Sequence, residues 1–476
     1  MKTGALWPTL EEARQRVLRI QTKLHRWAKN ESTARFDDLF NLVCDPAFLL
    51  IAWNRVRANR GARSSGVDGQ TAYSIISERG EYSFLSELRE QLKACRFRPL
   101  PVRERMIPKA GKPTKRRRLG IPTVRDRVVQ AALKLALEPI FEADFQPCSY
   151  GFRPKRRAQD AIAEIHFLAS RSYEWVLEGD IAACFDEIDH TALLDRVRRR
   201  IKDKRVVALI KAFCKAGILT EAGQQRDTVT GTPQGGILSP LLANIALSVL
   251  DDHFAEAWQA MGASSGQRQY RRRKGLATYR LVRYADDFVV LLAGHREHVD
   301  VVRSTVAQVL VPMGLRLSEE KTTITHIDQG FDFLGFHIRR CPKEGTGKRY
   351  IYTWPSKAAL MAVKARVRTL TRQGRNLSLQ ILLHRLNPVL RGWTNYFRHG
   401  ISSRTFNYLR AFTWRRVVCW LRHKHPRLNW KQLRRRYLSN WWPAEGDVVL
   451  FNPGAVVVIR YRYRGRIASP WSWEGS

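Results

Sequence analysis

Three aspartates have the side chains and the surroundings for metal-assisted chemistry on phosphate groups. Asp286 and Asp287 are adjacent in RLVRYADDFVVLLAG (280–294), between two apolar runs that predict the strands of a hairpin. Asp180 ends another apolar strand, in VLEGDIAACFDEI. Charges seldom enter apolar surroundings without compensation, and a bound metal ion is one form of it. Carboxylate oxygens suit Mg²⁺, and phosphoryl transfer commonly uses two such ions side by side.

The strand context carries this interpretation, because an Asp-Asp pair alone means little. Two other pairs are present, Asp37-Asp38 in ARFDDLFNLV and Asp251-Asp252 in SVLDDHFAEA. Both have apolar neighbours at helical spacing, so we interpret them as polar faces of amphipathic helices. A single acid is as often structural as functional, whereas three acids at the ends of predicted strands favour a metal site.

The overall charge indicates a polyanionic partner. The chain has 476 residues, of which 83 are Lys or Arg and 43 are Asp or Glu, a net charge of +40. Such a charge repels itself in a compact fold, and nucleic acid would relieve the repulsion. A secreted or membrane-surface protein is the alternative. The N-terminal MKTGALWPTLEEARQ lacks the apolar segment of a signal peptide, and no apolar run reaches membrane-spanning length. Seven scattered cysteines without a C-x-x-C pair indicate reduced thiols and a cytoplasmic location.

Strands and helices alternate along the chain, which predicts an α/β or α+β core. Residues 1 to about 60 have helical periodicity. FRPLPVRERMIPKAGKPTKRRRLGIPTVRDRVVQ predicts a strand, a basic turn, a second strand and a helix. GTPQGGILSPLLANI predicts a turn that begins a helix, and QRQYRRRKG (267–275) predicts a basic loop. LRLSEEKTTITHI and FDFLGFHI are strand-like.

Residues 345–444 differ in composition from the rest. They contain 22 Lys or Arg, no Asp or Glu, and seven of the fourteen tryptophans. Three amphipathic helices are predicted near 356–375, 378–398 and 404–423, followed by a short β-rich tail in VVLFNPGAVVVIRYRYRG. Basic helices with interleaved aromatic residues suit contact with phosphates and stacking on unpaired bases, although many of the tryptophans are expected in the core.

Several motifs together resemble one family. YADD between apolar strands resembles the catalytic hairpin of reverse transcriptases, and GDIAACFDEIDH, GTPQGGILSPLLANI, LSEEKT and FLGF follow in that family's order. NRGARSSGVDG, RRRLGIP and SYGFRP narrow the resemblance to reverse transcriptases encoded by group II introns. LNPVLRGWTNYFRHG (386–400) resembles the maturase, or thumb, domain of those proteins.

The resemblance implies a right-hand polymerase with an antiparallel palm sheet, followed by a helical thumb. We expect a helical N-terminal extension and the start of the fingers at 1–95, and the fingers and palm at 96–345. The thumb or maturase domain is expected at 346–445, and a short basic β-rich tail, which we interpret as a remnant of a DNA-binding segment, at 446–476.

The resemblance also assigns roles to residues. Asp180, Asp286 and Asp287, with the backbone carbonyl of Ile181, would hold two Mg²⁺ ions. Phe185 matches the residue that excludes nucleotides with a 2′-hydroxyl. The alternative interpretation of Phe185 is an aromatic residue of the core. The other implied nucleotide contacts are Lys109 (or Lys112, since the basic turn is longer than usual), Arg117, Gln234, Gly235 and Lys321. The implied primer, template and RNA contacts are Leu334, Gly335, Arg391, Trp393, Tyr396 and Arg398. Cys184, beside Phe185, is interpreted as packing.

The implied protein is an RNA-directed DNA polymerase and maturase that binds its host intron RNA, promotes splicing and copies the intron into DNA during retrohoming. Its expected partners are the intron RNA, a DNA target and primer, and deoxynucleoside triphosphates. We expect no membrane association and a location in the bacterial cytoplasm or nucleoid. Whether the protein forms a homodimer stays open. The chain has no cysteine-paired H-N-H endonuclease motif, so we expect a primer that it does not cut itself. Two alternatives stay open: a related reverse transcriptase in phage defence or another host role, and an RNA-binding splicing factor without polymerase activity.

Overall fold

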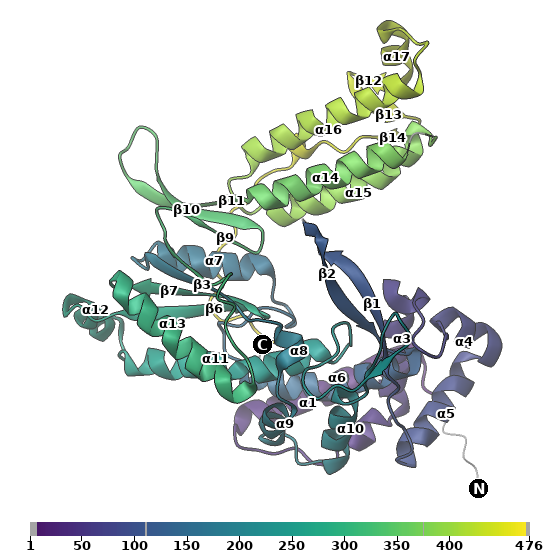
Figure 1. Ribbon diagram of the computed structural model, residues 1–476, viewed down its shortest axis with the longest axis vertical. Helices are drawn as coiled ribbons and strands as arrows, with labels where there is room; N and C mark the ends of the chain where they lie inside the picture. Colours follow the sequence, from purple (N-terminus) through teal and green to yellow (C-terminus); the bar gives the residue numbers. More distant parts are fainter. Residues whose placement is uncertain (1–6, 110–111, 375, 473–476) are drawn as a thin grey trace. The chain divides into compact units, whose positions relative to one another are not determined.

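The computed structural model of the chain describes residues 7–109, 112–374 and 376–472, without the side chains at 109 and 112–115. The chain forms two compact units between which it passes four times (Figure 1). Unit 1 comprises Met1–Arg157, Leu177–Ile324 and Gly465–Ser476, and unit 2 comprises Ala158–Val176 and Thr325–Arg464. None of the described helices has the length and apolar character needed to cross a bilayer.

A four-stranded sheet, most of whose residues belong to unit 1, has the strand order β6-β7-β3-β8. Its strands are β6 (Thr278–Tyr284), β7 (Asp287–Ala293), β3 (Trp175–Asp180) and β8 (Thr323–His326). The β6 and β7 strands are antiparallel, in register from Thr278↔Ala293 to Tyr284↔Asp287. Six consecutive residues of β7 are buried, which is why its sequence is continuously apolar rather than alternating. Helix α11 (Ser239–Ala260) packs against β6 and against α13 (Arg296–Leu310).

A layer of helices forms the N-terminal part of unit 1. Helices α1 (Leu10–Asn30), α3 (Pro46–Ala58) and α6 (Val124–Asp144) pack against one another, and α6 is buried along most of its length. Helix α1 begins with a capping box in which Thr9 and Glu12 satisfy each other's backbone N–H groups. The prediction of helices in residues 1–60 is confirmed for these segments.

The prediction of a helix around Asp37-Asp38 was wrong. Both residues lie in a loop, and Asp38 has a φ of +55°. After the single turn of α2 (Phe40–Val43), a new helix starts at Pro46, where Asp45 caps the backbone N–H of Ala47 at 2.8 Å. Proline at the first helical position together with an Asp cap strongly favours the start of a helix. The apolar periodicity of this segment is therefore interrupted at Pro46, and the residues before it do not belong to the same helix.

The basic hairpin also has the predicted strand–turn–strand order. Strand β1 (Val102–Lys109) pairs antiparallel with β2 (Lys112–Ile121), and β1 pairs on its other side with the short β4 (Ile218–Leu219), followed by β5 (Gln225–Arg226). The remaining helices of unit 1 are α4 (Ala72–Arg79), α5 (Glu81–Lys93), α8 (Cys184–Glu187), α9 (His190–Arg198), α10 (Lys204–Cys214) and α12 (Ser265–Arg273).

Helix α12 corrects the prediction of a basic loop at 267–275. Ser264 and Gln267 form a capping box at its start, with Gln267 N donating to Ser264 Oγ at 3.2 Å. The arginines that follow have high helix propensity, so a segment without apolar periodicity is still helical.

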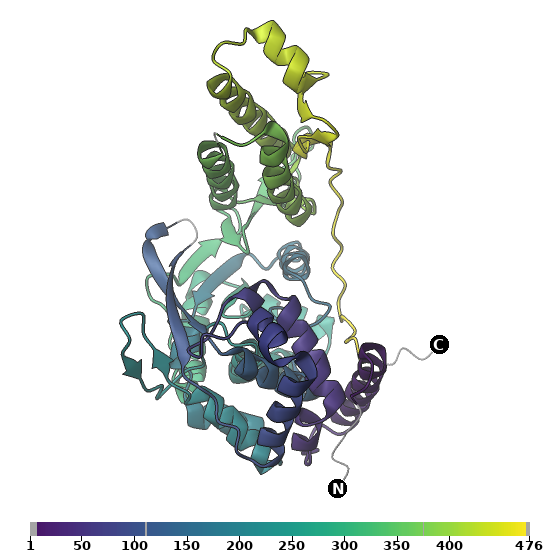
Figure 2. The same ribbon diagram turned by 90° about the vertical axis from the view of Figure 1, so that its right-hand side faces the viewer.

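Unit 2 combines a three-stranded sheet with a helical bundle. The sheet has the order β11-β10-β9, from β9 (Phe331–Phe333), β10 (Phe336–Pro342) and β11 (Arg349–Pro355), and α7 (Ala158–Ala169) packs near β11. Helices α14 (Lys357–Gln373), α15 (Leu379–Phe397) and α16 (Ser403–Lys424) confirm the three predicted helices and lie side by side (Figure 2). Their core is leucine-rich and includes the buried Trp420.

The tail after α16 has less β structure than predicted. It contains α17 (Trp430–Tyr437) and the small strands β12 (Leu438–Ser439), β13 (Trp442–Glu445) and β14 (Val448–Val449). Residues 456–464, the apolar and basic part of the predicted β tail, run as an extended segment outside any strand (Figure 2). Within this segment Val456 N donates to the Pro453 carbonyl at 3.2 Å and Ile459 N donates to the Arg398 carbonyl at 2.9 Å, and side-chain hydrogen bonds hold its later part.

The last described residues belong to unit 1 again. Trp471 is 7% exposed, and its Nε1 donates to Gln21 Oε1 at 3.2 Å. Gln21 Nε2 donates in turn to the Leu135 carbonyl at 2.7 Å, so Trp471 joins the contact between α1 and α6. A segment near residue 470 therefore completes a helical layer that is otherwise built from the first 145 residues.

Gly151 offers a test of the packing around the β6–β7 turn. A Cβ atom at Gly151 would lie 2.3 Å from the backbone nitrogen of Ala285, too close for any side chain. We expect Gly151→Ala to destabilise the fold by about 1–3 kcal/mol, as overpacking does, measured by urea unfolding. The control is Gly266→Ala in α12, where the nearest atom would lie 3.8 Å away and no loss is expected. Equal stability of the two variants would contradict the packing.

Candidate active site

The paired aspartates lie at the turn of the β6–β7 hairpin, as predicted. Tyr284 and Asp287 are the last residues paired in the ladder, so Ala285 and Asp286 form a two-residue loop. Ala285 has a φ of +58°, in the left-handed region that such loops use. Asp286 is half-buried and Asp287 is exposed.

Asp180 is the last residue of β3, the strand next to β7. The backbone carbonyl of Asp180 accepts a hydrogen bond from Ser318 N at 2.8 Å, and Ile181 forms an isolated bridge with Leu317. The carboxylate Oδ2 of Asp180 lies 2.6 Å from Lys321 Nζ. Strand order therefore places Asp180 near the Asp286–Asp287 pair, although more than a hundred residues separate them in the sequence.

The three carboxylates interact electrostatically. Burial is the main cause that raises the pKa of Asp286, and the negative charge of Asp180 adds to it. The pKa of Asp287 is raised to about 6, first by the protein atoms crowded around the carboxyl group and then by Asp286 and Asp180. The Lys321 ammonium lowers both pKa values, but only in part. The ionised site thus costs free energy that a bound cation would offset.

The donor set fits hard divalent cations. Asp180, Asp286, Asp287 and the Ile181 carbonyl offer oxygen ligands, which Mg²⁺ prefers. Within the described ranges, no three His, Cys, Asp or Glu side chains stand ready as a complete metal cluster. Mg²⁺ in nucleotide-processing sites is typically held by one or two carboxylates, with water and substrate phosphates completing its shell. The carboxylates therefore suit ions whose coordination the substrate completes.

A buried ion pair supports the aspartate loop. The side chains of Arg283 and Asp251 are both 0% exposed, and Arg283 Nε donates to Asp251 Oδ1 at 2.7 Å. Arg283 Nη1 donates to the Ala285 carbonyl at 2.8 Å and to Asn244 Oδ1 at 3.0 Å, and Nη2 donates to Ser149 Oγ at 2.8 Å. One guanidinium thus connects α11, the loop that follows α6 and the turn between Ala285 and Asp287.

Asp251 is a functional-site residue that the sequence interpretation missed. It was expected on a polar helix face, but it is the buried partner of Arg283, whereas the neighbouring Asp252 is partly exposed and pairs with Arg196 at 2.7 Å. The available signal was Arg283 itself, a charge directly beside the apolar residues Leu281 and Val282 and close to the apolar run of β7, which requires a buried acid. The sequence does not reveal which acid that is.

Two predicted nucleotide contacts share a cavity in unit 1. Phe185 and Gln234 line a space of about 270 Å³, together with Arg118 and Gly120 of β2. Gly120 N donates to the Gln234 carbonyl at 2.6 Å. Gly235 has a φ of +112°, a backbone conformation that favours glycine. A Cβ there would also lie 2.5 Å from the Gly120 carbonyl oxygen, so the close contact requires glycine as well.

Two neighbouring arginines of β2 differ in their position relative to the cavity of Phe185. Arg118, which the sequence analysis did not single out, lines the cavity of Phe185, while the exposed Arg117 is not among the cavity's lining residues. Arg118 also counteracts the burial that raises the pKa of Asp186. The side chains of Lys109 and Lys112 lie outside the described residues, so the choice between them stays a prediction.

Cys184 is packed, as the sequence analysis inferred. It is 3% exposed, and burial raises the pKa of its thiol to about 12, with the charge of Asp286 as a second cause. A thiol that stays protonated at neutral pH is a poor nucleophile.

The remaining predicted contacts lie in unit 2. Leu334 and Gly335 form the turn of the β9–β10 hairpin, with φ values of +48° and +79°. Tyr396 Oη donates to the Leu334 carbonyl at 3.0 Å, and Trp393 packs on Phe397 with ring centroids 4.7 Å apart. Both aromatic residues therefore hold the turn and the helix in place. The last two predicted contacts are the exposed Arg391 and the half-buried Arg398.

Comparison with known proteins gives two family matches. Residues 107–338 match the family described as reverse transcriptase (RNA-dependent DNA polymerase), and residues 360–438 match the maturase-specific domain of group II introns. The chain is 35% identical over 363 residues to protein YkfC of Escherichia coli K12, which covers 72% of this chain and 93% of YkfC.

Two further relatives are intron proteins. The chain is 34% identical over 360 residues to the group II intron-encoded protein LtrA of Lactococcus lactis subsp. cremoris, covering 66% of this chain and 58% of LtrA. It is 28% identical over 404 residues to an uncharacterized 91 kDa protein in the cob intron of Schizosaccharomyces pombe, covering 73% of this chain and 49% of that protein. The chain thus spans nearly all of YkfC but little more than half of LtrA.

Adjacent aspartates allow a matched test of the buried pair. Asp251→Asn leaves the Arg283 charge buried without its counter-ion, so we expect a loss of about 3–5 kcal/mol in the free energy of unfolding. Asp252→Asn breaks a partly exposed pair and should cost no more than about 1 kcal/mol. Urea unfolding followed by circular dichroism measures both, and similar losses for the two variants would refute the supporting role of Arg283 and Asp251.

The raised pKa of Asp287 predicts pH-dependent cation binding. Because only about a quarter of a group with a pKa near 6 is ionised at pH 5.5, Mn²⁺ affinity measured by electron paramagnetic resonance should be roughly fourfold weaker there than at pH 7.5. The stability of the fold depends on pH in the opposite direction. Ionised Asp287 destabilises the fold above pH 6, and this destabilisation disappears below the ordinary pKa of aspartate. Asp287→Asn should flatten the dependence of affinity on pH, and an unchanged slope would rule out Asp287 as its source.

Proposed function

Because the chain belongs to the reverse transcriptases encoded by group II introns, we propose that it copies its own intron RNA into DNA and assists the splicing of that RNA. The observation that carries the polymerase half is the meeting of Asp180 with the Asp286–Asp287 turn on adjacent strands, inside the segment that matches reverse transcriptases. The maturase half rests on the second family match and on the acid-free composition of residues 345–444.

The proposed architecture is a right-hand polymerase. The sheet β6-β7-β3-β8 is the palm, the β1–β2 hairpin belongs to the fingers, and α14–α16 form the thumb or maturase domain. In this division the N-terminal extension and the start of the fingers cover 1–95, fingers and palm 96–345, the thumb 346–445 and the basic tail 446–476. The maturase family match at 360–438 lies within the proposed thumb.

Asp180, Asp286 and Asp287, with the Ile181 carbonyl, are proposed to hold two Mg²⁺ ions. Such a pair of ions activates an attacking hydroxyl and stabilises a leaving oxygen. Lys321 holds a proton on Nζ, 2.6 Å from Asp180 Oδ2, and we assign this proton to the departing pyrophosphate. The half-buried Phe185 ring is proposed to lie under the sugar and select deoxynucleoside triphosphates, with Gln234 and Gly235 shaping the pocket and Lys109 and Arg117 contacting the triphosphate.

The splicing role requires counter-charge for a folded RNA. Unit 2 contains the whole acid-free segment 345–444, and Arg391 and Arg398 of LNPVLRGWTNYFRHG (386–400) are proposed RNA contacts, with Trp393, Tyr396, Leu334 and Gly335 shaping the surface beside the primer and template. In this role the protein stabilises the RNA through its phosphates, and the splicing chemistry is the RNA's own. The proposed setting is the bacterial cytoplasm or nucleoid, with a DNA target and primer as further partners.

Primer extension on an RNA template tests the polymerase half. Asp286→Asn removes one charged ligand of the site, and we expect DNA synthesis to fall by more than about 100-fold. The control is Asp38→Asn, which changes one member of another, exposed Asp-Asp pair and should leave the rate unchanged.

A splicing assay with the intron that encodes the chain separates the two halves. Asp286→Asn should still promote splicing, because the proposed RNA contacts do not include Asp286. Synthesis at the wild-type rate in this variant would contradict the assignment of Asp286 to the polymerase site, and wild-type protein that promotes splicing without copying RNA would favour a splicing factor without polymerase activity. Wild-type protein that copies RNA but leaves splicing unchanged would favour a reverse transcriptase with another host role.

A further inference from the structure

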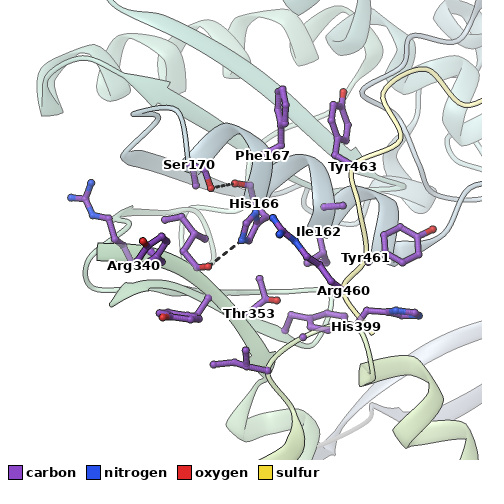
Figure 3. A pocket seen from close by; sticks show the side chains of 18 of the residues that line it. Ile162, His166, Phe167, Ser170, Arg340, Thr353, His399, Arg460, Tyr461 and Tyr463 are labelled. Atoms are coloured by element: carbon purple, nitrogen blue, oxygen red, sulfur yellow. Dashed lines mark hydrogen bonds between the residues drawn. The ribbon is translucent and has the colours of Figure 1, made fainter. Parts of the chain in front are cut away.

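Unit 2 contains a large groove that none of the residues assigned above line. It has a volume of about 1300 Å³ and is bounded by α7, by the β10–β11 hairpin, by residues 399–401 and by the extended tail at 458–463 (Figure 3). Pockets for single small ligands usually have about 300–1,000 Å³, so the groove is larger than a typical small-molecule site. All its walls belong to one unit.

The extended tail is anchored to α7 through a buried carboxylate. Asp160 is 2% exposed, and it accepts hydrogen bonds from Tyr461 Oη and from Arg464 Nε, each at 2.8 Å. A second bond joins Arg464 Nη2 to Asp160 Oδ2, also at 2.8 Å. Buried carboxylates require such donors, so these contacts fix the backbone on both sides of Arg462. The tail is therefore a wall of the groove with a defined position.

The groove is strongly basic. Six cationic residues line it, against the single acid Glu174: Arg171, Arg340, Lys343, Arg349, Arg460 and Arg462. Arg340 pairs with Glu174 and Asp328, and Arg349 pairs with Asp328, so two of the six are neutralised. Arg460 and Arg462 are exposed, on alternate positions to the half-buried Tyr461 and Tyr463.

Arg460 extends toward His166 inside the groove (Figure 3). His166 Nε2 lies 3.1 Å from the Ile351 carbonyl oxygen, and burial lowers the pKa of His166, with the charge of Arg460 as a further cause. His166 is therefore neutral near pH 7, and its ring donates to the protein backbone. The positive charge facing the groove comes from the arginines and lysine.

Aromatic faces lie between these charges. Phe167 and Tyr463 have ring centroids 4.6 Å apart, and the Arg171 guanidinium lies 3.5 Å from the Phe167 centroid. Tyr350, which is 45% exposed, and Tyr352 line the side formed by β11. Positive charge along a groove with interleaved rings is the pattern of proteins that bind single-stranded nucleic acid, where phosphates meet the cations and bases stack on the rings.

We propose that this groove binds an unpaired stretch of RNA, with its phosphates at Arg460 and Arg462 and its bases against Tyr350, Tyr352 and Phe167. The inference deepens the proposed function, because it names a second place, in the unit without the three aspartates, where the chain holds RNA. Recognition here is of single strands, since a duplex keeps its base faces covered.

Crosslinking with the full chain locates the strand directly. A short oligouridylate that carries 4-thiouridine is irradiated with the wild-type protein in buffer with EDTA and no nucleotides, and the crosslinked peptides are identified by mass spectrometry. We expect crosslinks in 349–355 and 458–463. Crosslinks confined to other segments would overturn the proposal.

Two arginines then test the charge contacts by fluorescence anisotropy with the same oligomer. Arg460→Ala with Arg462→Ala should weaken binding at least about fivefold and reduce the slope of log K against log salt by about 1.4, the value for two phosphate contacts with a single strand. The matched control is Arg19→Ala with Arg26→Ala, which removes two exposed charges from α1 and should change neither quantity. Equal effects of the two double variants would mean that only net charge matters and would overturn the site.

Competitors and a conservative variant complete the test. Replacing both arginines by lysine should keep most of the affinity, which excludes unfolding as the cause of the loss. Displacement by polyglutamate as effective as by oligouridylate, or tighter binding of oligothymidylate than of oligouridylate, would refute an RNA site. Because these measurements need neither metal nor nucleotides, a negative result leaves the polymerase assay unaffected, and an inactive polymerase leaves this test intact.

Discussion

The ion pair between Arg283 and Asp251 holds the loop from which two of the three aspartates project. An apolar pair could fill the same space, and buried ion pairs often contribute little net stability. An apolar pair could not donate a hydrogen bond to the carbonyl of Ala285. Ala285 has a left-handed backbone conformation although it is not a glycine. The guanidinium therefore fixes the conformation of the turn more than it stabilises the fold.

The site opposes the charge of the chain as a whole. A net charge of +40 attracts nucleic acid over long distances, with a range that salt limits. Against this background, Asp180, Asp286 and Asp287 form a local patch of the opposite sign, and their mutual repulsion adds to the burial that raises the pKa of Asp286 and Asp287. Among the residues that the structure describes, Lys321 is the cation that forms a salt bridge with Asp180, and its side chain is 60% exposed. A cation with higher charge density can compete for this carboxylate because the ammonium is not enclosed.

The sequence predicted the features that depend on local pattern. The β6–β7 hairpin, the strand ending at Asp180 and the three helices α14–α16 all follow from periodicity over a few turns or residue pairs. Features that depend on distant partners were missed. Asp251 looks like a surface residue until β6 places Arg283 against it, and Arg118 enters the Phe185 cavity through a strand register that the basic turn does not reveal. The segment 456–464 has β-type alternation, but its partners are side chains of α7 rather than a neighbouring strand.

The contact of Trp471 with Gln21 sets an order of events during synthesis. Chains emerge from the ribosome N-terminal end first, and domains generally fold as they emerge. Helix α1 is among the first elements available, yet the indole that covers Gln21 arrives only after some 450 further residues. Until then the polar side chain lacks its indole partner, and unit 1 cannot reach its final packing. A chain that ends before Trp471 would therefore carry an unfinished N-terminal layer even where its aspartate strands are whole.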